Sequence, residues 1–282
     1  MAGFEIATAS ADDVRLICGW AADEGWSPGR TDHWAFHAAD PTGYLMGRLD
    51  GEPVASISVV RYGADFGFLG CYIARPPVRG KGYGLRIWQA GMKLAAGRNV
   101  GLDGVPAQQA NYQKSGFRLA WNNVRYEGAA PVGVEPPGGV RFVDARGVPF
   151  DRLAAYDRRF FPAARDSFLA PWITAPERAA LVALKDGEIV GFGVIRAGAA
   201  SSRIGPLYAA SPAIAAALVS TLGQAMPGAA VAIDVPEVNK AAVALVGEMG
   251  FKPAFATARM YTGADPVCEI AGFYSVTSFE LG

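Results

Sequence analysis

The chain has 282 residues, 51% of them hydrophobic, and its 26 basic side chains balance its 26 acidic ones. This length exceeds that of a usual single domain, so two domains of about 140 residues are expected. A net charge of zero gives no electrostatic reason to expect nucleic acid or a membrane surface as a partner. The three cysteines are odd in number and widely spaced, which favours a reducing, cytoplasmic setting over a disulfide framework or a zinc ribbon. The first residues also lack the pattern of a signal peptide.

In chain order, the first half is expected to start with two helices, over residues 12–23 and 32–39, and to continue into strands over 53–62 and 66–74. The last of these strands runs into a glycine-rich turn, and apolar residues at helical spacing follow from Leu85. A further strand, a second helix and a closing strand are expected to complete this half.

The glycine-rich turn reads Arg79-Gly-Lys-Gly-Tyr-Gly84. Glycine bares backbone N–H groups at the positive end of the following helix, which predicts an anion site suited to a pyrophosphate. A G-x-G-x-x-G dinucleotide fingerprint is excluded because Leu85 stands at the third glycine position, and a P-loop because no Ser or Thr follows Lys81. A strand-to-helix turn that binds nothing is the alternative.

The turn resembles the R-G-x-G-x-G signature of the GNAT acetyltransferases, and a second motif about 30 residues later agrees with it. This motif, Tyr112-Gln-Lys-Ser-Gly-Phe117, resembles the Y-x-K-x-G-F run that ends the last helix of a GNAT domain. The resemblance implies acetyl-CoA as co-substrate and Tyr112 as the group that protonates the departing thiolate. An ordinary packed tyrosine is the alternative. The implied acetyl-CoA site consists of Tyr72, Ile73, Ala74, Arg79, Gly80, Lys81, Gly82, Tyr83, Gly84 and Tyr112.

An internal repeat indicates that the chain is a tandem. Matching segments recur in one order at a spacing of about 135 residues. The matches pair Asp50-Gly-Glu52 with Asp186-Gly-Glu188, Gly70–Ala74 with Gly205–Ala209, Asp103 with Asp234, Gly116-Phe117 with Gly250-Phe251, and Arg125 with Arg259. The predicted fold class is α/β with mixed sheets, and the resemblance implies two tandem GNAT (acyl-CoA N-acyltransferase) domains.

Residues 129–140 contain three prolines and three glycines and are interpreted as a linker. The predicted domains are therefore residues 1–128 and 141–282. The predicted elements of the second domain are helices over 150–160 and 176–180 and strands over 189–196 and 203–209. Its charge-free stretch, 204–233, contains three prolines, so it is interpreted as a strand end, an alanine-rich helix and another strand rather than a transmembrane helix.

The second half resembles the YitH-type GNAT domain. The runs that carry this resemblance are 156–172, 204–209, 234–239 and 258–261. In the first half, Glu24-Gly-Trp-Ser-Pro-Gly29 resembles the E-G-W-N-P-G turn of the same tandem proteins.

The two copies differ at the positions of the glycine-rich turn and of Tyr112. The second has Ala210-Ser-Pro-Ala-Ile-Ala-Ala216 in place of the glycine turn, and Val246 at the position of Tyr112. Alanine Cβ atoms would crowd a pyrophosphate where glycine does not. The first half is therefore predicted to bind acetyl-CoA and to catalyse, and the second to have lost that site and to shape the acceptor cleft.

The expected reaction is direct attack of an amine on the thioester. Pantetheine is expected to pair with the strand edge at Ile73–Ala74, and a backbone N–H at 72–74 to polarise the thioester carbonyl. Strand 66–74 lacks the glutamate base that many GNAT enzymes carry there, so the base candidates are Glu24, His33, Asp65 and Asp103. Glu24 is the first choice because its turn is expected to line the acceptor side, and a solvated loop carboxylate is the alternative.

The acceptor-cleft candidates, which would give the site charges and an aromatic wall, are Trp26, Asp157, Arg165 and Trp172. The phenylalanines near Trp172 are expected in the helix core. His33 and His37 have a helical metal-binding spacing but lack further ligands, so no metal is expected. Cys71 lacks a nearby histidine and is interpreted as a buried strand residue rather than an acyl-enzyme nucleophile.

The predicted function is N-acetyl transfer from acetyl-CoA to a primary amine of a small molecule. A protein amine as acceptor, or a non-catalytic acyl-CoA-binding regulatory module, are the alternatives. Neutral charge and the cover of a second domain favour a small, enclosed acceptor. Tyr112 favours an enzyme, because binding alone needs no proton donor. A monomer or homodimer is expected.

Overall fold

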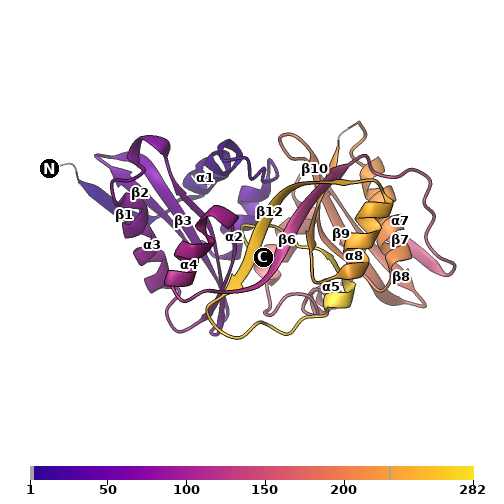
Figure 1. Cartoon of the computed structure of the whole chain (residues 1–282). Helices are drawn as coiled ribbons and strands as arrows, with labels where there is room; N and C mark the ends of the chain where they lie inside the picture. Colours follow the sequence, from indigo (N-terminus) through magenta and orange to yellow (C-terminus); the bar gives the residue numbers. More distant parts are fainter. Residues whose placement is uncertain (1–2, 229) are drawn as a thin grey trace.

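The computed structural model describes residues 3–228 and 230–282 and shows a mixed α/β protein built on one large sheet (Figure 1). The sheet has 13 strands: twelve follow the order β1-β2-β3-β4-β5-β12-β6-β11-β10-β9-β8-β7, and β13 pairs with β10 outside this path. The predicted α/β fold class is confirmed.

The first half forms the elements that its sequence pattern predicts. Its helices are α1 (Ala11–Asp23), α2 (Asp32–Ala39), α3 (Tyr83–Leu94) and α4 (Gln109–Lys114), with 3₁₀ turns at Pro76–Val78 and Pro106–Gln108. Its strands are β1 (Phe4–Thr8), β2 (Tyr44–Leu49), β3 (Glu52–Tyr62), β4 (Phe66–Ala74), β5 (Asn99–Gly104) and β6 (Arg118–Gly128). Helix α1 begins at a capping box in which Ser10 and Asp13 bond each other's backbone N–H. Its buried residues Val14, Ile17 and Ala21 then follow at helical spacing.

The second half repeats this order and corrects one prediction. Its helices are α5 (Phe150–Asp157), α6 (Asp166–Thr174), α7 (Pro212–Gln224) and α8 (Lys240–Glu248), with 3₁₀ turns at Ala145–Gly147 and Ile270–Gly272. Its strands are β7 (Val140–Asp144), β8 (Arg178–Lys185), β9 (Glu188–Arg196), β10 (Ser202–Ala209), β11 (Val231–Pro236), β12 (Lys252–Tyr261) and β13 (Phe273–Ser275). The helix predicted over 176–180 is wrong, because Arg178–Ala180 pair with β9, and this pairing outweighs the helix propensity of the alanines.

Two further expectations concern the segments that join the elements. The charge-free stretch is confirmed as the end of β10, helix α7 and the start of β11. Residues 129–139 form neither helix nor strand between β6 and β7. The division of the chain at 129–140 into two domains stays a prediction, because the sheet does not divide there.

The two halves exchange their closing strands. Strand β6 of the first half lies between β12 and β11, and β12 of the second half lies between β5 and β6. Figure 1 shows these two long strands side by side across the middle of the molecule. Each half of the sequence therefore completes the part of the sheet that the other half begins.

Two buried ion pairs join the exchanged strands, each between an arginine of one half and an aspartate of the other. Arg125 Nε on β6 lies 2.7 Å from Asp234 Oδ1 on β11, and Arg259 on β12 donates to both oxygens of Asp103 on β5, at 2.8 and 2.7 Å. These four residues are the arginines and aspartates that the sequence repeat relates. The repeat is therefore visible in the structure as two equivalent contacts across the exchange.

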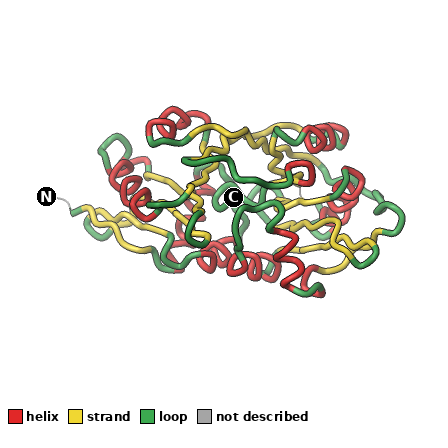
Figure 2. The backbone as a smooth tube through the Cα atoms, turned by 90° about the horizontal axis from the view of Figure 1, so that it is seen from below, coloured by secondary structure: helices red, strands yellow, loops and turns green. Residues whose placement is uncertain are grey.

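The C-terminal tail, residues 273–282, is buried inside the molecule. Its strand β13 pairs antiparallel with β10, and the Val276 N–H donates to the Asp234 carbonyl of β11 at 3.0 Å. Further along, the Tyr62 hydroxyl donates to the Leu281 carbonyl at 3.1 Å. Two perpendicular views place the end of the chain at the centre of the molecule (Figures 1 and 2). The tail thus runs from the second half to the first.

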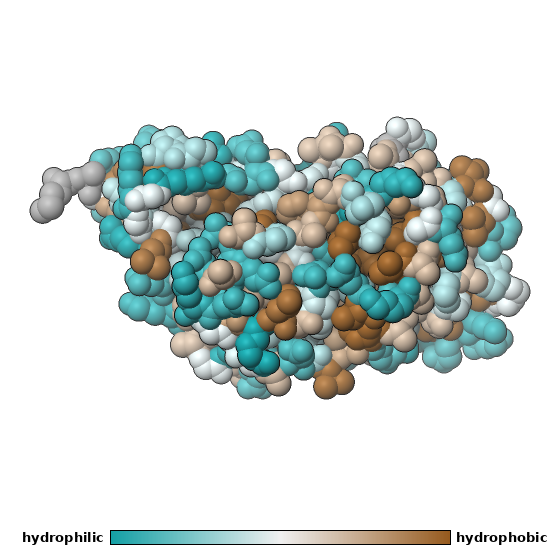
Figure 3. Space-filling view, viewed as in Figure 1, coloured by the Kyte–Doolittle hydropathy of each residue, from teal (hydrophilic) through white to brown (hydrophobic). Residues whose placement is uncertain are grey.

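Hydrophilic residues cover most of the first half on the face drawn in Figure 3, and hydrophobic residues are more frequent over the second half, near α8. Among the described helices, none has the length and apolar character needed to cross a bilayer. Within the long uncharged stretch of the second half, strands β10 and β11 are buried and helix α7 is largely buried.

Candidate active site

A groove opens in the first half where two parallel strands separate. Strands β4 and β5 pair over Phe66–Leu69 of β4, and the rest of β4 has no strand on that side. The groove has an empty volume of about 1310 Å³, and its lining includes Tyr72, Ile73, Ala74, Arg79, Gly80, Gly82, Gly84 and Tyr112. The two other residues predicted to bind the cofactor lie beside it: Lys81 is exposed, and Tyr83 packs on Phe4 with ring centroids 4.8 Å apart.

A β-bulge precedes the free edge of β4. Ser58 of β3 lies opposite Gly70, whereas Ser56 lies opposite Ile73, so β4 contains one extra residue. Cys71 occupies the bulge with a φ of +47°, a left-handed conformation that is uncommon outside glycine. The Ser56 hydroxyl donates to the Cys71 carbonyl at 2.8 Å. The bulge re-aims the backbone that follows it, which forms the wall of the groove.

The glycine-rich turn leaves the N-terminus of α3 without a side-chain cap. Gly80 and Gly82 have φ values of +74° and +86°, which glycine adopts without strain. The first N–H groups of α3 are therefore available to an anion. Arg79 fastens the turn, because its Nε donates to the Ala74 carbonyl at 2.8 Å and its guanidinium also pairs with Glu24.

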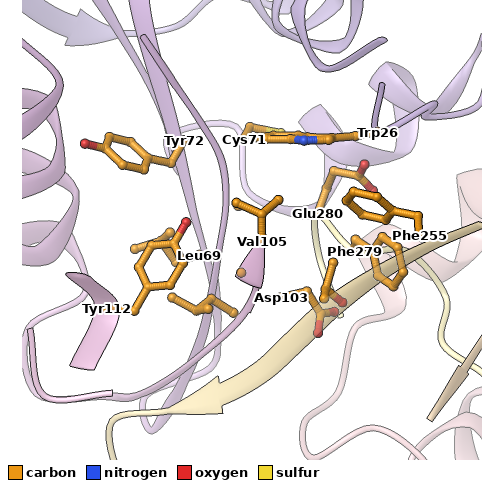
Figure 4. A pocket seen from close by; sticks show the side chains of 14 residues that line it. Trp26, Leu69, Cys71, Tyr72, Asp103, Val105, Tyr112, Phe255, Phe279 and Glu280 are labelled. Carbon is orange, nitrogen blue, oxygen red and sulfur yellow. The ribbon is translucent and has the colours of Figure 1, made fainter. Parts of the chain in front are cut away.

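Tyr112, on α4, lies where the groove meets a second hollow. Its ring stacks on Trp88 at a centroid distance of 5.5 Å and packs against Gly104, where a Cβ would come within 2.2 Å of the ring. Burial raises the pKa of Tyr112 to about 12, so its hydroxyl keeps its proton at neutral pH. In Figure 4 this hydroxyl points into the space between Tyr72 and Val105. Tyr112 therefore presents an O–H group where the two hollows meet.

The second hollow, called the inner hollow below, adjoins the groove and shares five lining residues with it: Trp26, Tyr72, Val105, Tyr112 and Phe255. Three aromatic rings form part of its wall: Trp26 from the loop after α1, Phe255 from β12 and Phe279 from the tail (Figure 4). Trp26, a predicted acceptor-cleft residue, does line this hollow. Because the walls come from both halves, neither half forms the inner hollow alone.

One carboxylate of the inner hollow has no partner. Glu280, on the tail, is 2% exposed, and neither of its carboxylate oxygens bonds any group in the described part of the chain. Burial raises the pKa of Glu280. Its backbone packs on Gly70 of β4, where a Cβ would come within 2.2 Å of the Glu280 carbonyl oxygen. No sequence pattern points to Glu280, because the tail lies beyond the last match of the repeat and carries no motif.

The base candidates named from the sequence are engaged or lie elsewhere. Glu24 lines the groove and is paired with Arg79, so its role as base stays a prediction. Asp103 lines the inner hollow, but its oxygens accept from Arg259 and from Asn123. The candidates that line neither hollow are His33 and Asp65.

Thiol chemistry finds little support in the inner hollow. Cys71 lines it, but burial raises the pKa of the Cys71 thiol far above its usual range, which disfavours the nucleophilic thiolate. Within residues 3–228 and 230–282, no three His, Cys, Asp or Glu side chains gather into a possible metal site.

Three residues predicted to line the acceptor cleft lie in the protein interior instead. Asp157 and Arg165 form a buried ion pair with a closest distance of 2.7 Å. Trp172 is fully buried, stacks on Phe168 at 4.7 Å and donates its indole N–H to the Gly205 carbonyl at 3.0 Å. The two charges compensate each other and the indole packs in the core, and none of the three lines the groove or the inner hollow. The neighbouring phenylalanines are core residues, as expected.

The equivalent place in the second half is filled. Helix α7 has a side-chain cap where α3 has none: the Ser211 hydroxyl accepts from the Ile214 N–H at 3.4 Å. Strand β13 pairs with Leu207 and Tyr208 of β10, the repeat equivalents of the free edge of β4. Val246, at the position of Tyr112, is buried in the core.

Comparison with known families identifies both halves. A model described as the acetyltransferase (GNAT) family matches residues 12–117, and one described as an acetyltransferase (GNAT) domain matches residues 153–272. A relative named holothin acyltransferase, from Pseudoalteromonas sp. (strain SANK 73390), is 33% identical over 275 residues. The match spans 97% of this chain and 93% of that protein.

Solved structures share the whole fold. A candidate acetyltransferase from Pyrococcus horikoshii has a TM-score of 0.82 at 21% identity, covering 99% of this chain and 96% of its own. A tandem GNAT protein from the clavulanic acid biosynthesis pathway has a TM-score of 0.67 at 16% identity, covering 93% of this chain and 100% of its own. The finer YitH-type assignment of the second half stays a prediction.

Proposed function

Because the chain belongs to the GNAT acetyltransferase family, it is an acyltransferase, and we propose that it moves acetyl from acetyl-CoA to a primary amine of a small molecule. The observation that carries this proposal is Tyr112, a protonated hydroxyl that lines both the groove and the inner hollow. The groove is the proposed acetyl-CoA site, and the inner hollow is the proposed acceptor site.

The groove offers one contact for each part of the cofactor. The uncapped N-terminus of α3 would bind the pyrophosphate through its backbone N–H groups. The free edge of β4 at Tyr72–Ala74 would pair with pantetheine as an added strand does. A backbone N–H of the same edge would stabilise the oxyanion that forms on the thioester carbonyl, a contribution of about 3 kcal/mol for one donor.

The chemistry then needs one proton donor at the sulfur. The neutral amine nitrogen attacks the carbonyl carbon, and the carbon–sulfur bond breaks as the tetrahedral intermediate collapses. Tyr112 gives its proton to the leaving sulfur. A regulatory module that only binds acyl-CoA would need no such group, which favours an enzyme.

The shape of the inner hollow favours a small and largely apolar acceptor. Aromatic rings line it, and its walls come from both halves, which leaves less room for a protein chain than for a small molecule. By its name, the 33% identical relative acylates holothin, and one structural neighbour comes from a biosynthetic pathway. Both names support a small-molecule acceptor over a protein amine.

Calorimetric titration of acetyl-CoA tests the proposal. We expect one site per chain in the wild type and loss of binding in Gly82→Trp, because the indole would fill the anion site. Gly97→Trp is the matched control, since Gly97 also has a positive φ, of +81°, with open space around it, and lies in the turn after α3. Primary amines would then be screened by the release of free CoA. Absence of binding by the wild type would overturn the proposal.

A further inference from the structure

We propose that Glu280 is the general base of this acyl transfer, carried into the inner hollow by the C-terminal tail. The inference rests on the proposed function and adds the group that accepts the proton of the amine. It also assigns a task to the second half, which holds the tail in place.

The side chain of Glu280 is buried without a partner among the described residues. Burying an ionisable group without a partner is costly, and buried polar atoms nearly always have hydrogen-bond partners. The carboxylate of Glu280 has none among the described residues, and Glu280 is one of the residues that line the inner hollow. The other carboxylate of the hollow, Asp103, is already paired with Arg259. An amine, with N–H donors on an otherwise uncharged molecule, is the ligand that would satisfy Glu280.

Glu280 lies beside β4, the strand that forms the wall of the groove. This strand has no carboxylate of its own, yet the Glu280 backbone lies against Gly70, next to the bulge at Cys71. Any side chain at Gly70 would displace the tail there. The tail therefore supplies a carboxylate to the strand whose edge faces the proposed thioester. Figure 4 shows Glu280 between Trp26 and Phe255 in the wall of the hollow.

Residues of the second half hold the tail in place. The Asn239 side chain donates to the Phe273 carbonyl at 3.0 Å, and Arg165 donates to the Thr277 hydroxyl at 2.9 Å. Gly205, the repeat equivalent of Gly70, leaves room for the tail backbone, because a Cβ would come within 2.5 Å of the Val276 carbonyl oxygen. The tail fills the second copy of the groove and ends in the first. Arg165 is in this view a positioning residue rather than an acceptor contact.

The surroundings of Glu280 contain charges and weak acids from several elements. The charged neighbours are Asp32 on α2, Arg125 on β6, Arg196 on β9 and Arg203 on β10. The weak acids are Cys18 on α1, Tyr44 on β2 and Cys71 on β4. Burial has the largest influence on Glu280 and raises its pKa, against the opposite effect of the arginines. A carboxylate in this state is a stronger proton acceptor than one in water.

Every proton and every bond of the proposed acyl transfer is accounted for. The amine nitrogen forms a bond to the carbonyl carbon and passes one proton to Glu280, while the carbon–sulfur bond breaks and Tyr112 protonates the sulfur. The products are the amide and free CoA. Glu280 then loses its proton to solvent and the Tyr112 phenolate regains one, so the enzyme returns to its starting state.

The test compares Glu280→Gln with wild type by the release of CoA from acetyl-CoA. The acceptors are 2-phenylethylamine as probe and, without it, water, which is always present. We expect release to fall about 100-fold or more in both cases and to lose its acidic limb in the pH profile. The affinity for acetyl-CoA should not change, because Glu280 does not line the groove. Glu269→Gln is the matched control, since Glu269 is an exposed residue paired with Arg159.

A second pair of variants keeps the test valid if Glu280→Gln folds poorly. Gly70→Ala would push the Glu280 backbone away, whereas Gly67→Ala on the same strand meets its nearest atom at an ordinary 3.5 Å. Only Gly70→Ala should slow the release of CoA. Unchanged release and pH profile in Glu280→Gln, with acetyl-CoA still bound, would overturn the inference alone. A wild type that binds no acetyl-CoA, or binds it and releases no CoA with either acceptor, would overturn the proposed function as well.

Discussion

The two copies of the groove differ in what fills them. In the first half, β4 has a free edge after Leu69, and α3 begins without a side-chain cap. In the second half, β13 pairs with the equivalent edge of β10, and Ser211 caps α7. The strand bulge is present in both copies. The fold therefore builds the same opening twice, and the chain itself closes one of them.

This difference suggests a way in which the same fold can keep or close a ligand site. Backbone groups at a strand edge and a helix N-terminus need partners, whether from a ligand or from the protein. The second half meets this need with its own tail and its own serine, and we infer that it no longer binds acetyl-CoA. The same tail then reaches the first half, so the loss of one site and the completion of the other are linked by a single segment.

Replacement of Tyr112, the proposed proton donor of the first half, gives the largest expected effect. Tyr112→Phe should lower the turnover number about 10²–10⁴-fold, because the thiolate would leave without a proton donor. The dissociation constant of acetyl-CoA should not change. Tyr126→Phe is the control, since Tyr126 lies on β6 and lines neither hollow. A Tyr112→Phe variant with full turnover would remove the reason to call this copy the catalytic one.

Breaking either of the two ion pairs that join the exchanged strands should lower the free energy of unfolding. Arg259→Met leaves Asp103 buried with only Asn123 as a partner, and breaking a buried pair costs about 3–5 kcal/mol. Arg125→Met should cost less, because Asp234 keeps Arg203. Urea unfolding of the two variants measures the difference. Equal losses would contradict the view that the two equivalent contacts differ in their remaining partners.

The parts of this site that depend on residues close together in the sequence can be predicted from the sequence alone. The glycine turn, Tyr112 and the edge at Ile73–Ala74 follow from residues close in the sequence, and all of them line the groove. The strand exchange was missed, because either closing strand has the pattern to pair with either half. The burial of Asp157 and Arg165 could not be predicted for a related reason. The sequence of two helical segments does not show whether their charged residues face solvent or pair with each other in the interior.

The tail gives a prediction on pH. Since burial raises the pKa of Glu280 in the folded protein above its value in the unfolded chain, the stability associated with its protonated form is present below the unfolded pKa and is lost as the pH rises through the folded pKa. Glu280→Gln removes this loss. The variant should match the wild type in melting temperature near pH 4 and exceed it increasingly toward pH 8. A constant difference over this range would show that Glu280 is not buried as a carboxylate.

Removal of the Ser211 cap on helix α7, in the second half, gives the smallest expected effect. Ser211→Ala removes the bond to the Ile214 N–H, a long one at 3.4 Å, so the free energy of unfolding should fall by about 0.5–1 kcal/mol. The number of acetyl-CoA sites should not rise, because β13 still occupies the edge of β10. Denaturant unfolding and calorimetric titration of the same variant measure both quantities. A second acetyl-CoA site in Ser211→Ala would mean that the Ser211 cap, and not the C-terminal tail, keeps the second half from binding acetyl-CoA.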